Sequence, residues 1–286
     1  MNKEQLFEQI EAGMEQVFHE ESFTEYLKVM ASFHAYSLSN TMLIAMQKPE
    51  ATYVAGFHDW RKKYGRLVNK GEKAIWIIAP MIVKKKETDN EDVHKVVRGF
   101  RRVPVFDVSQ THGDPLPDPV TKTLTGKVED YDQLLETLTL ISPAPVSFEH
   151  INGEAKGCYN PRSNEITIQE GMPQAQTIKT LIHEMAHAIL HGADDPLSRQ
   201  RREYEAESTA YTVCQHYGID ASSYSFPYLA LWAKDMDLEE KKASMGRILN
   251  TADTIITKTD AVRYPLFVNA EKKLQMKPVE EILELD

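Results

Sequence analysis

Apolar residues near the start of the chain recur at the spacing of a helix. Between Ser22 and Gln47 they are Tyr26, Leu27, Met30, Phe33, Met42, Leu43 and Met46. This pattern predicts a largely helical segment that ends before Pro49. Three short β-type runs follow, ATYVAG, KAIWIIAPMIV and VPVFDV, and the charged stretch KKKETDNEDVHK between the last two is typical of a hairpin tip. The first part of the chain is therefore predicted to be an α+β unit.

A proline-rich stretch separates this unit from the rest of the chain. Pro115, Pro117 and Pro119 stand at alternate positions in GDPLPDPVTK, which removes backbone donors and disfavours both helix and central strand. We place a domain boundary near residue 125, which gives predicted domains of residues 1–125 and 126–286.

The second domain is predicted to be mostly helical with a small sheet. EDYDQLLETLTLI has the pattern of an amphipathic helix, PVSFEH that of a strand, and KGCYN with EITIQE that of a hairpin. Four further helices are expected over Gln174–His191, Ser198–Tyr217, residues around Tyr228–Lys234, and Leu238 to about Thr257. The predicted fold class of the whole chain is α+β.

Composition argues against a membrane-spanning or secreted protein. The chain is 42% hydrophobic, and charge interrupts each long apolar stretch, so no membrane-spanning segment is expected. The N-terminal MNKEQLFEQIEAG is predicted to be a polar helix rather than a signal peptide. Two cysteines, Cys158 and Cys214, are too few for a disulfide framework, which favours a reducing cytoplasm.

Charge is distributed unevenly along the chain. The net charge is −10, yet Lys48–Arg102 holds 14 Lys or Arg against 7 Asp or Glu, so this segment is +7 and the remainder −17. An acidic protein is a poor general candidate for nucleic-acid binding, but a basic block of this kind keeps an anionic partner in consideration.

The sequence LIHEMAHAIL carries the strongest chemical signal. His183 and His187 are four residues apart, so on one helix they present two imidazoles to the same point. Taking about 100° per residue, the histidines lie opposite the apolar face of that helix. Two imidazoles at this spacing are typical zinc ligands, and Glu184 between them is a candidate general base.

A third ligand is expected from the next predicted helix, RREYEAESTAYTVCQHYG. Glu203 and Glu207 border the face that carries small apolar residues, whereas Glu205 is predicted to point into solvent. We interpret Glu203 as the ligand and Glu207 as a carboxylate that accepts a hydrogen bond from a histidine, with the two roles open to exchange.

These residues also have structural interpretations without function. Taken alone, His183 and His187 could belong to a solvated helix face, and His191 is interpreted as a rim residue because three ligands already suffice. Cys214 is expected to be small core packing. The hairpin GCYNPRSNEITI could offer an edge strand to an extended peptide.

Two resemblances add to this picture. LIHEMAHAILHG followed by EYEAESTAY resembles the ImmA/IrrE-type metallopeptidases of the gluzincin group. In that family a Glu on the following helix completes a zinc site, which implies a zincin-like domain with Zn²⁺ held by His183, His187 and Glu203. In that pattern the residue four positions after the ligand supports the site, which matches Glu207. The resemblance also implies a protein or peptide substrate for the base Glu184.

The N-terminal part resembles the single-stranded-DNA-binding domain of ArdC-type antirestriction proteins. The resemblance covers SLSNTMLIAMQKPEATYVAGFHDWRKKYGRLVNKGEKAIWIIAP and FRRVPVFDVSQTHGDPLP, which include the basic block. Cations follow phosphates and aromatic rings stack on bases in such domains. The candidate DNA-binding residues are Lys48, Tyr53, Arg61, Lys62, Lys63, Arg66, Lys70 and Lys73. Trp60 and Trp76 could instead be core residues, and Trp76, in an apolar strand, is expected to be buried.

The leading functional hypothesis joins both resemblances. It describes a cytoplasmic protein of a mobile genetic element in which a single-stranded-DNA-binding domain tethers a zinc peptidase, acting in antirestriction or in cleavage of a repressor. One alternative is a DNA-binding protector whose zinc site is structural or vestigial. Another is a peptidase regulated by a protein partner that docks on the N-terminal domain.

Overall fold

The computed structural model describes residues 20–86, 93–116, 130–219 and 236–264, which form two compact units. The described part of the first unit is residues 20–22, 35–86 and 93–116, and that of the second is residues 23–34, 130–219 and 236–264. The predicted helix around residues 228–234, the proline-rich linker beyond Leu116 and the boundary near residue 125 lie outside the described residues. The α+β class predicted from the sequence is confirmed.

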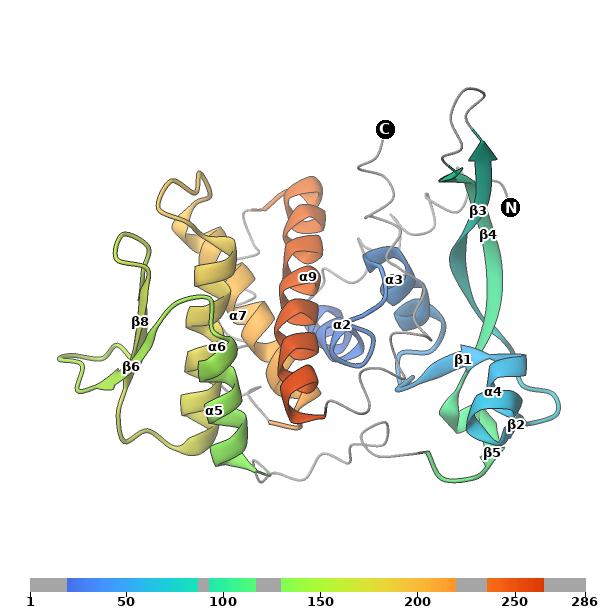
Figure 1. Ribbon diagram of the computed structural model, residues 1–286, viewed down its shortest axis with the longest axis horizontal. Coiled ribbons are helices and arrows are strands. Elements are labelled where there is room, and N and C mark those ends of the chain that lie inside the picture. Colours follow the sequence, from blue (N-terminus) through green and yellow to red (C-terminus); the bar gives the residue numbers. More distant parts are fainter. Residues whose placement is uncertain (1–19, 87–92, 117–129, 220–235, 265–286) are drawn as a thin grey trace. The chain divides into compact units, whose positions relative to one another are not determined.

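The first unit is built around a long two-stranded ribbon (Figure 1). Its elements are α3 (Leu38–Gln47), β1 (Val54–Gly56), α4 (Phe57–Tyr64), β2 (Arg66–Val68), β3 (Ile75–Lys86), β4 (Val93–Asp107), a 3₁₀ turn (Val108–Gln110) and β5 (Thr111–Gly113). One sheet has the order β1-β4-β3, and β2 pairs with β5 in a second. All of these pairings are antiparallel.

Helix α3 closes part of the edge of β3. The side-chain amide of Asn40 donates to the carbonyl of Ile78 at 2.9 Å and accepts from its N–H at 2.8 Å. About two turns further along the same face of α3, the amide of Gln47 makes the same pair of bonds with the backbone of Trp76, at 3.0 and 2.9 Å. Two side chains therefore replace a neighbouring strand along this edge.

The second unit holds a bundle of helices and a small sheet. Its elements are α2 (Glu20–Ser32), α5 (Tyr131–Ile141), β6 (Val146–Glu149), β7 (Gly157–Asn160), β8 (Glu165–Gln169), α6 (Gln174–Leu190), α7 (Arg199–His216) and α9 (Leu238–Arg263). The sheet has the order β6-β8-β7, with β6 parallel and β7 antiparallel to β8. The predicted hairpin is therefore present, and β7 is an edge strand.

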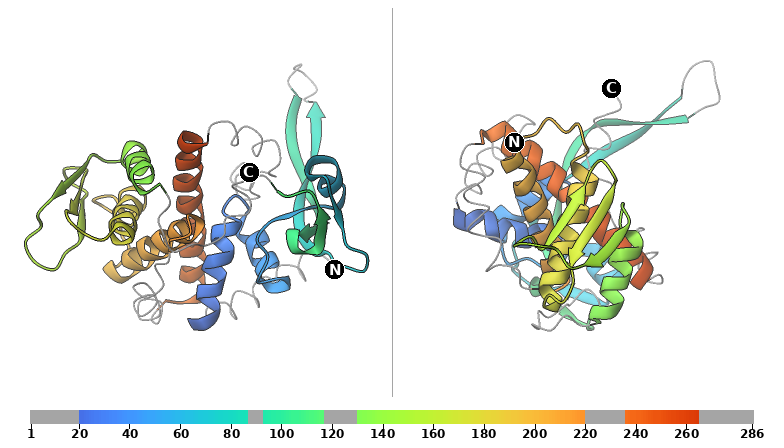
Figure 2. Two further views of the ribbon diagram at one scale, coloured as in Figure 1. Left: turned by 90° about the horizontal axis from the view of Figure 1, so that it is seen from below. Right: turned by 90° about the vertical axis from the view of Figure 1, so that its left-hand side faces the viewer.

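Helix α7 lies at the centre of this unit, and the sequence suggests only part of its burial. It packs against α6 on one side and α9 on another, so its residues from Tyr204 to Cys214 are buried all round. The sheet lies beyond α6, on the side away from α9 (Figures 1 and 2). Helix α9 continues to Arg263, well past the predicted end near Thr257.

Helix α2 belongs to the second unit, although the sequence places it in the first domain. From Phe23 onward its apolar side chains are buried, and the Phe23 ring stacks on Tyr204 at a centroid distance of 5.6 Å. His216 on α7 contacts the carbonyl of Ala31 at 3.0 Å. The helix is also shorter than predicted, because residues 33–37 leave the helical path before Ser37 caps α3.

Among the described residues, none of the helices combines the length and the apolar character needed to cross a lipid bilayer.

Candidate metal centre

The two histidines of LIHEMAHAIL lie one turn apart on α6 and face the same point. Their Nε2 atoms are 3.1 Å apart, and both rings are largely covered by protein. The helix runs without interruption from the residue after Pro173 to Leu190, so the four-residue spacing becomes a geometric pair.

Glu203 brings a carboxylate to this pair from the first turns of α7. Its Oε2 lies 3.4 Å from His183 Nε2 and 3.6 Å from His187 Nε2. The side-chain hydroxyl of Ser198 accepts a hydrogen bond from the N–H of Arg201. This N-cap fixes the start of α7 just before Glu203. These three residues are also the group of potential metal ligands that the described part of the chain brings together.

The spacing of these donor atoms fits a zinc ion. Ligands held tetrahedrally at about 2.0–2.1 Å from zinc lie about 3.3 Å from one another. The three observed separations, 3.1, 3.4 and 3.6 Å, surround that value. Two imidazoles and one carboxylate are also a donor set that zinc accepts in catalytic sites, where three protein ligands leave a fourth position open.

Glu184 lies beside the two histidines, where α6 meets the edge strand β7. Its side chain is 7% exposed, and the backbone N–H of Tyr159 donates to the carboxylate. Burial raises its pKa, although the two histidines and this N–H act in the opposite direction. A carboxylate with a raised pKa accepts protons more readily, as a general base requires.

Gly157 permits the close approach of β7 to α6. A Cβ at this position would lie 2.6 Å from Cγ2 of Thr180 and 3.0 Å from Cγ and Oε1 of Glu184. A side chain at residue 157 would therefore push the edge strand away from the base.

Glu207 contacts the ring nitrogen of His183 that faces away from the ligand cluster. Its Oε2 lies 3.1 Å from His183 Nδ1, and its Oε1 lies 2.7 Å from the ammonium of Lys179. Burial raises the pKa of Glu207, but His183 and Lys179 outweigh it and lower the pKa to about 2. An ionised Glu207 favours a proton on Nδ1 and leaves Nε2 free for a metal.

The carboxylates also dominate the electrostatics of the cluster. Burial lowers the pKa of His183, yet Glu203 and Glu207 together raise it to about 9. The contacts with His183 and His187 in turn hold the pKa of Glu203 far below its usual range. Three carboxylates around two imidazoles form an anionic site that favours a cation.

Two sequence predictions about the surroundings of this site are wrong. Glu205 does not point into solvent: it is fully buried, because α9 covers the side of α7 that the sequence leaves open. His191 is not a rim residue, since it is 3% exposed and contacts both His187 and Glu205. Histidines at positions 183, 187 and 191, each four apart, were the signal that could have found His191.

The candidate DNA-binding residues occupy several places in the first unit. Arg61, Lys62 and Lys63 form the exposed last turn of α4, where Lys63 also pairs with Asp59 at 3.1 Å. Lys70 and Lys73 are exposed in the connection between β2 and β3. These five cations are accessible to a phosphate backbone.

The other three candidates have structural partners within the unit. Arg66 donates from Nε to Thr111 Oγ1 at 2.8 Å and from a guanidinium nitrogen to the Thr111 carbonyl at 3.1 Å, so it links β2 to β5. Lys48 pairs with Glu50 at 2.7 Å. The hydroxyl of Tyr53 hydrogen-bonds that of Tyr64.

Trp60 is a core residue, whereas the prediction that Trp76 is buried is wrong. Trp60 is fully buried and donates to the carbonyl of Phe106 at 2.8 Å. Trp76 is 39% exposed, and the guanidinium of Arg102 lies over its ring, 4.8 Å from the centroid. The exposure of Trp76 could not be predicted from the sequence IWIIA, because a continuous apolar run does not show which side chains face outward. Phe57, 52% exposed at the start of α4, is a second accessible ring in the first unit.

Comparison with protein families confirms both resemblances. Residues 3–106 match the N-terminal domain of anti-restriction factor ArdC, and residues 146–218 match the IrrE N-terminal-like domain, a peptidase family. The second match contains His183, Glu184, His187, Glu203 and Glu207. The chain therefore joins an ArdC-type N-terminal domain to an IrrE-like domain.

The individual proteins that match the chain share less than a third of its residues. An uncharacterized protein of Bacillus anthracis is 28% identical over an alignment 333 positions long, which covers 98% of this chain and 56% of that protein. The chain thus spans about half the length of this relative. The metal-free crystal structure of antirestriction protein ArdC from plasmid R388 has a TM-score of 0.47 at 20% identity and covers 78% of this chain and 85% of its own. The Mn(II)-bound structure of that protein has a TM-score of 0.48 at 16% identity and covers 87% and 97%.

Proposed function

We propose that this protein is a zinc-dependent peptidase whose ArdC-type domain binds single-stranded DNA. The observation that carries the peptidase part is the triangle of donor atoms formed by His183, His187 and Glu203, with sides of 3.1–3.6 Å. The match of residues 146–218 to a peptidase family supports the same chemistry.

The chain supplies the groups that peptide hydrolysis requires. His183, His187 and Glu203 would hold the zinc ion, which would supply an activated water and a Lewis acid for the scissile carbonyl. Glu184 accepts a proton from the attacking water and returns it to the leaving amine. The strand β7, next to Glu184, is at the edge of the small sheet, where an extended peptide can add as a further strand.

The DNA-binding part rests on the first unit. The match to the ArdC N-terminal domain covers this unit as far as residue 106, and the exposed turn of Arg61, Lys62 and Lys63 lies on the same helix as the accessible ring of Phe57. Cations beside exposed rings are what single strands bind. A role in antirestriction is the biological setting that this domain suggests, with DNA bringing the peptidase to a protein substrate.

Metal analysis and a matched pair of chains test the peptidase. Purified protein should contain about one zinc per chain, and His183→Ala or His187→Ala should lose it. Glu184→Gln should keep the metal and the fold but lack hydrolysis, because the amide cannot accept the proton. Proteomes of cells that produce the parent chain and the Glu184→Gln chain should differ by cleavage of specific proteins.

The alternative of a DNA-binding protector with a structural zinc makes the opposite prediction. Both chains would then bind zinc and DNA equally, and no protein would be cleaved in a manner that depends on Glu184.

A further inference from the structure

His187 has a second ring nitrogen, and this nitrogen does not face solvent. Its Nε2 belongs to the ligand cluster, whereas its Nδ1 lies 2.9 Å from Nδ1 of His191, one turn further along the chain. The other nitrogen of His191 lies 3.1 Å from Oε2 of Glu205 on α7. The side chain of His191 therefore connects the ligand cluster to a carboxylate that is itself fully buried.

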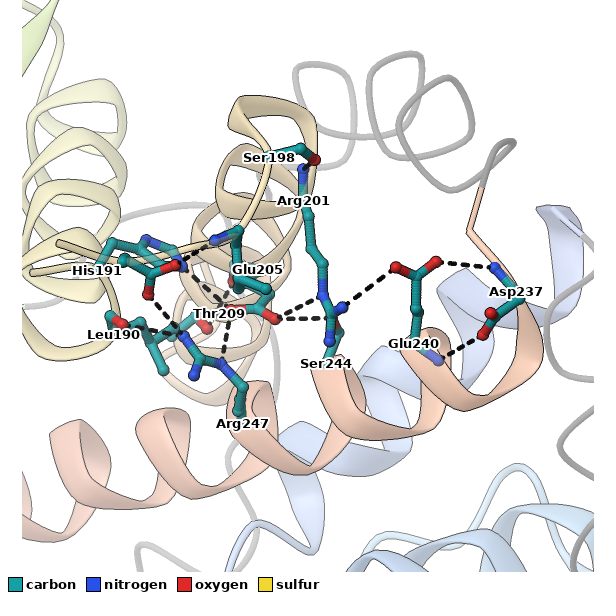
Figure 3. A network of polar contacts seen from close by, with 12 residues as sticks. Leu190, His191, Ser198, Arg201, Glu205, Thr209, Asp237, Glu240, Ser244 and Arg247 are labelled. Atoms are coloured by element: carbon teal, nitrogen blue, oxygen red, sulfur yellow. Dashed lines mark hydrogen bonds and ion pairs between the residues drawn. The ribbon is translucent and has the colours of Figure 1, made fainter.

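Helix α9 fixes this carboxylate from the other side. Ser244 donates from Oγ to Glu205 Oε1 at 2.7 Å, and Arg247 donates from Nε to Oε2 at 2.9 Å. Arg247 also donates to the carbonyl of Leu190, at the end of the ligand helix, at 2.9 Å. Figure 3 shows His191, Arg247 and Ser244 converging on Glu205.

The contacts from His187 through His191 to Glu205 allow only one arrangement of protons when His187 Nε2 is a metal ligand. A ligand nitrogen needs its lone pair, so the ring proton of His187 must be on Nδ1. His191 must then accept at Nδ1, which places its own proton on Nε2. That proton is donated to Glu205, which accepts from Ser244 and Arg247 as well.

The two ligand histidines are therefore supported differently. His183 contacts a carboxylate, Glu207, directly at 3.1 Å. His187 is too far along α6 for this arrangement and reaches its carboxylate through the imidazole of His191. The tautomers of these two histidines, one turn apart on α6, are therefore fixed in different ways, directly by a carboxylate for His183 and through a second imidazole for His187.

We propose that His191 and Glu205 are positioning residues that hold His187 in the tautomer and orientation required for metal binding. The proposal rests on the metal-binding part of the proposed function. Neither residue belongs to the group of potential ligands, which is His183, His187 and Glu203. Both act through His187. Ser244 and Arg247 of α9 hold Glu205 in place at the end of these contacts.

Zinc affinity of the full chain, measured by competition with a chromogenic chelator, tests this inference. His191→Leu should weaken zinc binding by about tenfold or more, as loss of an outer hydrogen-bond partner does at zinc sites. His191→Gln should stay close to the parent, because one amide can accept from His187 with its oxygen and donate to Glu205 with its nitrogen. The exposed His150→Leu is the control, and its affinity should not change.

A double-mutant cycle separates positioning from general packing. Glu205→Gln should weaken zinc binding in the parent chain but have no further effect in His191→Leu, because the connection is already broken. Additive losses would mean that the two residues act independently and would overturn the proposal. Cobalt substituted for zinc gives a second readout, since its absorption spectrum should change in His191→Leu and remain as in the parent in His191→Gln.

The remaining outcomes are also decisive. If His191→Leu does not fold, His191→Asn replaces it: the shorter amide reaches one neighbour only, so it should bind zinc more weakly than His191→Gln. Equal affinities for the Asn and Gln variants would overturn the inference. A parent chain without zinc would instead refute the proposed function itself, which keeps the two failures distinguishable.

Discussion

The Nδ1 nitrogen of His183 lies 3.1 Å from Glu207, while the Nε2 nitrogen of the same ring lies 3.4 Å from Glu203. One imidazole is thus held between two carboxylates of α7 that are four residues apart. Because each carboxylate faces a different ring nitrogen, only Glu203 lies on the side where His187 also presents its Nε2. The geometry assigns the two glutamates different tasks.

This difference gives the first prediction. Glu203→Gln should weaken zinc binding more than Glu207→Gln, because the first change removes a ligand and the second removes only a partner of a ligand, a loss of about 10–100-fold. Zinc affinity by chelator competition measures both. Glu239→Gln, on the surface of α9, is the control with no expected effect. The reverse order would exchange the roles of the two glutamates.

Gly157 provides a test of the edge strand. Gly157→Ala should leave zinc bound but reduce peptide hydrolysis by about tenfold or more, because the new Cβ displaces β7 and Glu184 from their close packing. Gly192→Ala is a matched control, since a Cβ there meets nothing within 4 Å. Metal content and cleavage of a substrate found by proteomics are compared in both chains. An unaffected Gly157→Ala enzyme would mean that β7 has no part in hydrolysis.

The two cysteines should react at very different rates with a thiol reagent. Cys158 on β7 is exposed, whereas Cys214 is fully buried and burial raises its pKa to about 12. One thiol should therefore react in the folded chain and two in denaturant, and Cys158→Ser should abolish the reaction of the folded chain.

The reactivity of Cys158 also reports on the site. Burial and the charge of Glu184 both raise its pKa, which lowers the fraction of reactive thiolate at a given pH. In Glu184→Gln that charge is absent, so the pKa falls and the reaction at pH 8 should become faster. An unchanged or slower rate would contradict this electrostatic contact.

The exposed end of α4 gives a prediction for DNA. Replacing Arg61, Lys62 and Lys63 with Gln in the full chain should weaken binding to a labelled oligothymidine. It should also reduce the slope of log affinity against log salt by about two, because each phosphate contact contributes about 0.7 on single strands. The control replaces three exposed cations of the second unit, Lys28, Lys156 and Lys258. An equal effect of both triple variants would show that net charge, and not this turn, governs binding.

Trp76 should contribute to the same interaction in a different way. Trp76→Ala should cost about 1–3 kcal/mol of binding if a base stacks on the exposed ring, with no change in the salt slope. Trp76→Phe retains an aromatic face and should recover most of the loss. Fluorescence anisotropy measures both variants, and equal affinities for parent and Trp76→Ala would remove the ring from the interface.

Local periodicity was enough to predict the helix of the metal ligands. His183 and His187 are brought together by the four-residue spacing alone, and the hairpin of β7 and β8 follows from turn residues between two short β-type runs. Glu203 and Glu207 were placed near the histidines because both border the apolar face of their helix.

Partners from distant parts of the sequence could not be predicted in this way. The pattern of α7 gives no sign that α9 covers the side of Glu205, so a fully buried carboxylate was assigned to solvent. The burial of His191 could not be predicted either, because its partner Glu205 lies on another helix. Trp76 shows the converse error, because a strand rich in apolar residues can still direct one of them outward.

The membership of α2 in the second unit has a consequence for synthesis of the protein. Phe23 leaves the ribosome early, but Tyr204, on which it stacks, is made roughly 180 residues later. At about 5–20 residues per second, this is a delay of about ten seconds or more. During that time the ArdC-type segment between them can fold on the nascent chain while α2 still has an uncovered apolar face. A chaperone that binds short apolar helices would therefore find its target here before the metal ligands have been translated.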